Sequence, residues 1–317
     1  MSMQSFMRLI AVVTALASTS WAAAAQQAGT TPGVPVQMVV SVEPKQGNEI
    51  PTITQQDVFV HQGKVHRPVI KWVPATGSYG RLALAVLIDD SAGPSLGTQF
   101  NDIKTFIQEQ ASTTDVAVGY MQNGTVFMTH NFTQDHAAAA KSLRLPLGYY
   151  GAEASPYVSL SDFIKRWPAN PAVPRREVLV LSSGIDPLYM GGYPDPYVDA
   201  AVQDAQCAHI VVYSIYTPSS GHFGHAYWLT FWGQNFLGQL SQETGGESYY
   251  FLGPQAPVSL SPYLNKLSRQ LRNQFLLTFP AEPRKKRGRE RVNITSEFHS
   301  VNLVYANQVC VPASPEE

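Results

Sequence analysis

The sequence predicts an α/β fold with a doubly wound, mostly parallel sheet and a small β-sandwich built from the N- and C-terminal segments. In the middle of the chain, short apolar blocks rich in Val, Ile and Leu alternate with segments of helical spacing. Both ends carry strand-like runs without helical periodicity. The chain has 317 residues, of which 44% are apolar, so it can bury a substantial core.

The first 25 residues are typical of a secretory signal peptide. A weakly basic start at Arg8 precedes a short apolar run, and the small residues Ala23 and Ala25 suit signal peptidase. A membrane anchor is the alternative interpretation, but polar residues interrupt the run, which is short for a span of about 20 residues. We expect cleavage after Ala25, a linker over 26–35 and a secreted or periplasmic protein without a membrane-spanning segment.

An N-terminal β segment is predicted over 36–78. The run VQMVVSV is strand-like, and DVFVHQGKVHRPVIKWV over 57–73 indicates two strands around Gln62 and Gly63. No helix is expected here.

The α/β domain is predicted over 79–272. Its expected strands, short and continuous as in a sheet covered on both faces, are 82–88, 115–121, 125–132, 177–183 and 209–216. Asn123 and Gly124 indicate a hairpin that adds an antiparallel edge strand. The expected helices are 97–109, 134–145, 156–167, 195–207, 230–244 and 260–273.

A C-terminal β segment is predicted over 273–312, with a tail over 313–317. Its expected strands are QFLLTFP, RVNITSEF and SVNLVYA. Because an isolated hairpin is marginal in water, we expect these strands to pair with the N-terminal segment. The α/β domain is then inserted between two halves of one sandwich.

The charge balance argues against a polyanionic partner. The chain has 22 basic and 23 acidic residues, so no overall field gathers nucleic acid or an anionic membrane. The basic run PRKKRGRER over 283–291 has no interleaved aromatic residue, and we interpret it as a solvated loop rather than a nucleic-acid site.

Two cysteines, Cys207 and Cys310, leave two alternatives open. In an oxidising compartment they can form a disulfide, or each can be a separately buried thiol. Their separation excludes a CxxC redox motif, and two thiols alone make a poor zinc site.

The stretch AVLIDDSAGPSLG over 85–97 carries the candidate site. Asp89 ends a predicted parallel strand, at the edge where doubly wound folds bind ligands. Neither glycine-rich phosphate motif is present, and the acids would repel a phosphate. A divalent cation is the better candidate.

The order of motifs around this stretch resembles the von Willebrand factor A domain. A strand with Asp-x-Ser is followed by a helix, a hairpin, a Ser-Pro loop and a strand that ends in a small-residue turn. The resemblance implies a Rossmann-like fold in which oxygens from three loops hold one Mg²⁺ or Mn²⁺ and leave a position for an acidic ligand residue.

Matching the sequence to this pattern gives three metal-ligand candidates. Asp89 and Ser91 take the first two positions, and Ser155, in GAEASPY, takes the threonine position.

Two departures weaken this match. The third position of the first loop falls on Gly93, where Ser95 would substitute only in a reshaped loop. Ser183 stands where the aspartate of the family belongs, and Asp186 lies three residues beyond it. Oxygen donors and charge are lost, so we expect a degenerate site with no cofactor or with weakly bound Mg²⁺ or Mn²⁺. Asp89 would then cap the following turn.

The resemblance covers nearly the whole mature chain. The leader from VQMVVSV to HRPV, the segment LGQLSQETGGESYYF and the segment LNKLSRQLRNQFLLTFP are similar to bacterial secreted proteins called VWFA-related.

Aromatic residues cluster in the loops expected at the same sheet edge, which favours protein binding. His222 and His225 lack a third ligand and are interpreted as surface residues. We expect Tyr157, Tyr197 and Trp228 to pack in the core. The predicted partner-binding residues are Ser95, Tyr150, Ser183, Asp186, Tyr189, Tyr193, His222, Phe223, His225 and Tyr227.

The sequence therefore predicts a non-catalytic module that binds a protein partner through these loops. One alternative is a structural component of an envelope complex, in which the α/β domain is a folded spacer. Another is a hydrolase using Ser91 or Ser183, although neither serine lies in a G-x-S-x-G motif.

Overall fold

The computed structural model describes residues 33–47, 49–149, 155–168, 173–220, 227–250 and 257–313. The predicted signal peptide and its cleavage after Ala25 lie outside these ranges. No helix in the described ranges is long and apolar enough to cross a bilayer.

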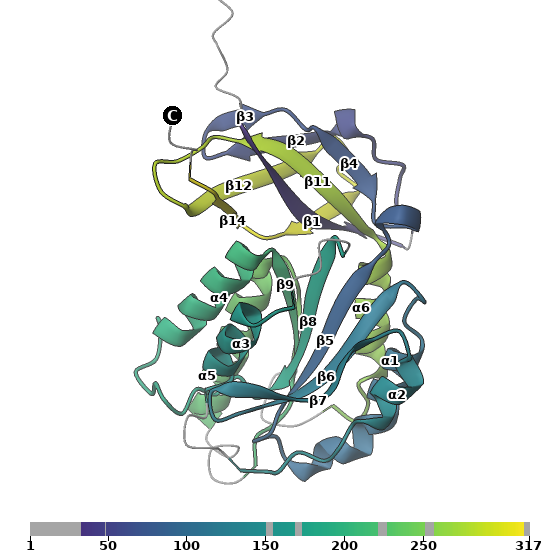
Figure 1. The fold of residues 1–317 in the computed structure, drawn as a ribbon, viewed down its shortest axis with the longest axis vertical. Coiled ribbons are helices and arrows are strands. Elements are labelled where there is room, and N and C mark those ends of the chain that lie inside the picture. The colour runs from purple at the N-terminus through teal and green to yellow at the C-terminus, as the bar shows by residue number, and fades with distance from the viewer. Residues whose placement is uncertain are drawn as a thin grey trace, which may run out of the picture. The chain divides into compact units, whose positions relative to one another are not determined.

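A six-stranded sheet forms the centre of the α/β domain, in the order β10-β9-β8-β5-β6-β7 (Figure 1). Neighbouring strands are parallel except β7, which is antiparallel to β6 and forms the predicted edge. The strands are β5 (Leu82–Asp89), β6 (Thr114–Gln122), β7 (Thr125–Thr133), β8 (Arg175–Ser182), β9 (Ile210–Tyr216) and β10 (Ser248–Tyr249). The predicted fold class is confirmed.

Helices cover both faces of this sheet, which explains why β5 is buried at every position. Side chains alternate along the strand, so Leu84 and Val86 pack in one core and Ala85 and Leu87 in the other. Figure 1 shows α1, α2 and α6 on one face and α3, α4 and α5 on the opposite face. The helices are α1 (Phe100–Gln108), α2 (His136–Lys141), α3 (Pro156–Lys165), α4 (Pro196–Ala208), α5 (Tyr227–Thr244) and α6 (Ser261–Arg272).

Two predicted helices are shorter than expected. The segment 97–109 begins as the 3₁₀ helix η3 (Pro94–Gln99) before α1 starts. The segment 134–145 is helical only in α2, because Pro146 disfavours helical backbone before it and Arg144 turns back to bind Asp90.

Strands from both ends of the chain pair in two four-stranded sheets, β13-β1-β11-β4 and β14-β12-β2-β3 (Figure 1). β1 (Val34–Pro44) runs antiparallel to β11 (Gln274–Ala281), and β2 (Val58–Gln62) to β12 (Gly288–Ser296). Apolar residues from each of these strands except β3 form one shared core. The predicted sandwich is therefore present.

Three details of the sandwich differ from the prediction. The segment 57–73 forms three strands rather than two: β2, β3 (Val65–Arg67) and β4 (Lys71–Pro74), with β4 in the opposite sheet. Pro68 lacks a backbone donor and interrupts the run. β14 (Gln308–Val311), which follows β13 (Val301–Tyr305), was not predicted, and β1 begins at Val34, inside the predicted linker. The short 3₁₀ helices η1 (Gln55–Asp57) and η2 (Gly77–Tyr79) complete the N-terminal segment.

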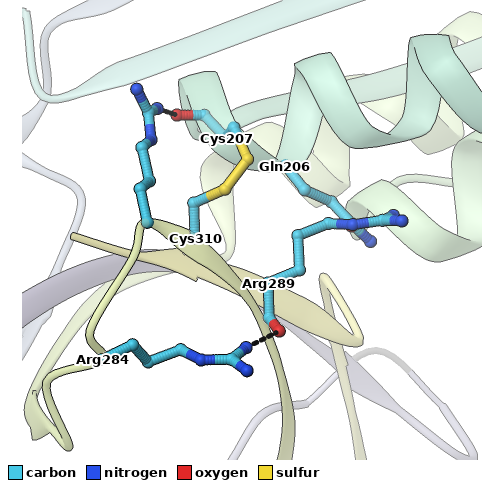
Figure 2. Close-up of a disulfide and its surroundings, with 6 residues drawn as sticks. Gln206, Cys207, Arg284, Arg289 and Cys310 are labelled. Carbon is cyan, nitrogen blue, oxygen red and sulfur yellow. Dashed lines mark hydrogen bonds between the residues drawn. A yellow bond between two sulfur atoms is a disulfide. The ribbon is translucent and has the colours of Figure 1, made fainter. Parts of the chain in front are cut away.

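Cys207 and Cys310 form a disulfide between the last turn of α4 and β14 (Figure 2). Their Cα atoms are 4.7 Å apart, within the range for such a bond. The structure thus selects the disulfide from the two alternatives.

Candidate functional site

Asp89 lies at the carboxyl end of β5 and links this strand to β8. Its Oδ1 accepts hydrogen bonds from the Ser91 backbone nitrogen, at 2.9 Å, and from the Ser91 hydroxyl, at 2.7 Å. Its Oδ2 accepts one from the Ser182 hydroxyl at 2.6 Å. The aspartate closes its own turn, as the capping alternative expected, and also binds the neighbouring strand.

Ser155 caps α3 and binds the loop that follows β8. Its hydroxyl accepts from the Val158 backbone nitrogen, at 3.3 Å, and donates to Asp186 Oδ2 at 2.6 Å. The Tyr157 hydroxyl donates to the Gly184 carbonyl at 2.7 Å. Thus the second predicted loop meets the third, through Asp186 rather than Ser183, whose hydroxyl accepts from the Ile185 backbone nitrogen.

Backbone bonds join the remaining loops at the same edge. The Gly93 nitrogen donates to the Pro218 carbonyl at 3.0 Å, and the Ser220 nitrogen to the Ser91 carbonyl at 2.9 Å. The Gly148 nitrogen donates to the Asp90 carbonyl at 2.8 Å. The carboxyl ends of parallel strands meet at one edge, so turns far apart in sequence form one surface here.

Asp90, next to the candidate ligand, is neutralised from within the protein. Both of its carboxylate oxygens accept from the Arg144 guanidinium at 2.7 Å, and Oδ1 also accepts from the Leu147 backbone nitrogen at 3.0 Å. The guanidinium carbon lies 3.8 Å from the centre of the Tyr120 ring. This bidentate pair orients the segment that follows α2.

Among the described residues, the other carboxylates of this edge have no comparable pairing with a positively charged side chain. Burial raises the pKa of Asp89, although hydrogen bonds from Ser182 and Ser91 oppose the shift. Burial likewise raises the pKa of Asp186 and, to about 6, that of Asp195, the N-cap of α4. These directions indicate acids that lack a nearby cation.

The donor set fits a hard divalent cation poorly. Of the matched ligands Asp89, Ser91 and Ser155, Asp89 alone is a carboxylate. Asp90, which lies next to it, is paired with Arg144. In the described part of the chain, no group of three or more His, Cys, Asp or Glu side chains could hold a metal. A dication prefers several charged oxygens, and this site offers mainly serine hydroxyls.

The predicted partner-binding residues divide into accessible and buried ones. Tyr193 is 78% exposed and Tyr227 71%, Ser95 is exposed, and Tyr189 is half-buried. Ser183 and Asp186 are buried, so their side chains do not reach a partner in this conformation. Tyr150, His222, Phe223 and His225 lie outside the described residues.

The expectation for three core aromatics was correct only for Tyr157, which is buried against Phe236. Tyr197 is 37% exposed and Trp228 is 52% exposed, because both lie in the first turns of their helices, beyond the end of the sheet. Both therefore add to the accessible surface.

Exposed apolar side chains gather at this edge to a degree that sequence reasoning missed. Among the described residues, 12 of the 16 exposed large apolar side chains lie on its loops and helix starts. We call this set the apolar surface: Leu145, Leu147, Tyr149, Leu188, Met190, Tyr193, Tyr197, Tyr227, Trp228, Phe231, Tyr250 and Val258. The available signal was a gap in charge, since no Asp, Glu, Lys or Arg occurs between Asp204 and Glu243.

Two segments that carry residues of the apolar surface are in contact. The backbone at Gly192, in the loop after β8, packs against the Trp232 indole of α5. The Trp232 ring meets the Trp228 ring edge-on, with centroids 4.9 Å apart. The loop carrying Tyr193 therefore rests on the helix that carries Trp228.

Comparison with known proteins found similar structures but no similar sequences. No protein-family model matches the chain, and no curated protein matches it. An aerotolerance-related membrane protein from Bacteroides fragilis NCTC 9343, with multiple mutations to serines, has a TM-score of 0.43 and 12% identity, covering 60% of this chain and 98% of that one.

Two further solved structures are similar at the same level. The conserved hypothetical protein BatB from Bacteroides thetaiotaomicron has a TM-score of 0.43 and 12% sequence identity, covering 60% of this chain and 97% of that one. The SpRpn10 VWA domain has a TM-score of 0.39 and 11% sequence identity, covering 59% of this chain and 95% of that one. At such values the fold assignment rests on the strand order of the structure itself.

Proposed function

We propose that this chain is a secreted or periplasmic, non-catalytic binding module of the von Willebrand factor A type, whose apolar surface docks a protein partner. The concentration of exposed large apolar side chains at the carboxyl edge carries the proposal. A concentration of exposed apolar side chains on one edge of a soluble protein often marks a binding site. Aromatic residues on loops and helix starts supply large contact areas at low entropic cost.

Partner binding at this edge does not depend on a metal in this proposal. Asp89 uses both carboxylate oxygens for hydrogen bonds to serines, and Ser155 donates its proton to Asp186. These bonds close the loops that a cation would otherwise hold together. A weakly bound Mg²⁺ or Mn²⁺ at Asp89, Ser91 and Ser155 is the alternative that magnesium titration tests.

The bonding of the two candidate nucleophiles favours a module without catalysis. Ser91 donates to the carboxylate of Asp89, and the Ser183 hydroxyl accepts from a backbone nitrogen of its own turn. Within the described residues, neither serine bonds a histidine that could act as a general base.

A capture experiment tests the proposal. The tagged protein is incubated with an envelope extract of the producing organism, with and without EDTA, and retained proteins are identified by mass spectrometry. We expect one partner to be retained in both conditions by the wild type and by Val65→Ser, which changes an exposed residue of the sandwich. The combined change Tyr193→Ser and Trp228→Ser should abolish retention. Equal retention by both variants would instead favour a folded spacer within an envelope complex.

A further inference from the structure

The disulfide borders a basic cleft on the side of the molecule where α4 meets the sandwich. The cleft has a volume of about 640 Å³, and both cysteines line it. Its charged lining residues are Lys165, Asp204, Arg287 and Arg289, so cations outnumber acids. A group that reaches the sulfur atoms through this cleft therefore meets positive charge.

The two cysteines differ in accessibility. Cys207 is partly exposed, whereas Cys310 is only 4% exposed. We therefore expect an external thiolate to reach Cys207 more readily than Cys310.

The two cysteines also differ as leaving groups. Cys310 lies directly across from Arg289 in the β12–β14 ladder, so the two side chains project from the same face. Figure 2 shows Arg289 and Cys310 both reaching from the sandwich toward α4. Cys207 lies in the last turn of α4, where the helix dipole disfavours a thiolate. Attack at Cys207 thus expels Cys310, rather than the cysteine at the negative end of the helix dipole, as the thiolate.

Hydrogen bonds to α4 hold the side chains of Arg287 and Arg289 in place. Arg287 donates to the Cys207 carbonyl at 3.0 Å, and Arg289 donates to Gln206 Oε1 at 3.2 Å. The backbone carbonyl of Arg289 accepts from Arg284 at 3.1 Å, as Figure 2 shows. These bonds hold Arg287 and Arg289 against the end of α4 that carries Cys207.

We propose that Cys207–Cys310 is a thiol–disulfide exchange site for anionic thiols. The incoming thiolate sulfur bonds to Cys207 Sγ while the Cys207–Cys310 bond breaks and its electron pair leaves on Cys310. A second thiolate attacks the incoming sulfur of the mixed disulfide and releases Cys207. In sum, two thiols are oxidised to a disulfide, and the two cysteines receive two electrons and two protons.

Exchange would remove a cross-link without removing a core, because Val309 and Val311 of β14 are buried in the sandwich. β14 has four residues and pairs with β12 alone in its sheet. Besides the disulfide, Gln206 donates to Asn307 Oδ1 at 3.0 Å, and Arg287 and Arg289 bond to α4, so we expect these contacts to persist after reduction. The covalent clamp between α4 and β14 becomes a noncovalent and reversible contact.

The experiment measures the rate at which the native, oxidised protein is reduced at neutral pH. The probes are reduced glutathione, an anionic thiol, and 2-mercaptoethanol, a neutral one, and products are alkylated and mapped by mass spectrometry. We expect reduction by glutathione to be much faster than global unfolding, measured separately in urea, with the adduct on Cys207. Reduction at the unfolding rate, or an adduct on Cys310, overturns the proposal.

Two comparisons isolate the role of the cations. Arg289→Gln should slow glutathione about fivefold or more relative to mercaptoethanol, whereas Lys285→Gln, the same charge change in the segment before β12 and outside the lining of this cleft, should not. If Arg289→Gln does not fold, raising the salt concentration on the wild type should slow glutathione selectively. Equal sensitivity of the two thiols to salt contradicts the proposal.

Discussion

Arg144 binds both carboxylate oxygens of Asp90 at 2.7 Å, although the two residues are 54 positions apart in the chain. The Asp90 side chain is 1% exposed and that of Arg144 is 37% exposed. The Tyr120 hydroxyl donates to the Arg144 carbonyl and accepts from its backbone nitrogen. The Arg144–Asp90 pair attaches the segment after α2 to the end of β5. This segment carries the exposed side chains of Leu145 and Leu147.

Replacing Arg144 should therefore destabilise the fold. We expect Arg144→Gln to lower the free energy of unfolding by about 2 kcal/mol, less than a fully buried pair because the guanidinium is partly exposed. Urea unfolding measures this loss. Arg166→Gln is the control, since its pair with Asp162 is solvent-exposed, and it should cost about 0.5 kcal/mol or less. Equal losses in the two variants would show that Asp90 does not need its partner.

The apolar surface should dominate partner affinity and contribute little to stability. Once a partner is captured, we expect Trp228→Ser or Tyr193→Ser to weaken its binding about 30-fold each, the effect of losing a hot spot of about 2 kcal/mol. Titration calorimetry measures the affinity, and thermal unfolding should remain within about 2 °C of the wild type. Val65→Ser should leave both quantities unchanged. A variant that binds normally would remove its residue from the interface.

Magnesium should leave the thermal stability unchanged. An ion that binds only the native protein raises the melting temperature, and the donor set around Asp89 is a poor one for such an ion. Melting curves with 0 to roughly 100-fold excess MgCl₂ or MnCl₂ should coincide. A rise that disappears in Asp89→Ala would establish a working cation site.

Asp195 should make stability depend on pH between about 4 and 6. Burial raises its pKa in the folded protein from 3.8 to about 6, while Oδ1 accepts from the Tyr197 and Val198 backbone nitrogens. A raised folded pKa means that the protonated form is favoured by folding. The contribution of Asp195 is present below about pH 4 and is lost as the pH rises through about 6.

The neutral variant Asp195→Asn isolates this effect, because asparagine is also a good N-cap. Its unfolding free energy relative to the wild type should rise from pH 4 to pH 6 and then level off. Urea unfolding at several pH values follows the difference, in which the other titrating groups cancel. A difference that does not vary with pH would contradict the raised pKa of Asp195.

Removing the disulfide should cost stability but leave partner binding intact. The cross-link closes a segment with a sequence separation of 103, and the double variant Cys207→Ser and Cys310→Ser should lose about 3 kcal/mol of unfolding free energy. Partner affinity should not change, because the disulfide lies at the end of α4 and the apolar surface at its start, on opposite ends of the helix. A loss below about 1 kcal/mol would mean that the bond constrains the unfolded chain little.

Local patterns were enough to predict most elements. The unbroken apolar run of β5 indicated a strand covered on both faces, and the Asn123–Gly124 turn indicated the antiparallel edge. Where prediction failed, partners distant in sequence decide the structure. Pairing with β11 places β4 in the opposite sheet from β2, and the bond to Asp90 holds Arg144 outside α2.

The candidate site was predictable in its position but not in its bonds. That Asp89 lies at the carboxyl edge follows from its place at the end of a parallel strand, and that Ser155 lies there follows from its place at the start of α3, the helix that leads into β8. That Ser155 meets Asp186, while Ser183 bonds its own turn, depends on the path of a loop. The exposure of Trp228 depends on how far α5 extends beyond the sheet, which its apolar composition does not reveal.

The antiparallel pairing of β1 with β11 has a consequence for biosynthesis. During translation, β1 emerges about 230 residues before its partner at Gln274. At roughly 5 to 20 residues per second, the ribosome needs about 10 to 50 s to supply that partner. Throughout that interval an apolar strand edge stays unpaired and prone to aggregation, so a chaperone or export factor that shields the nascent N-terminus would raise the yield of folded protein.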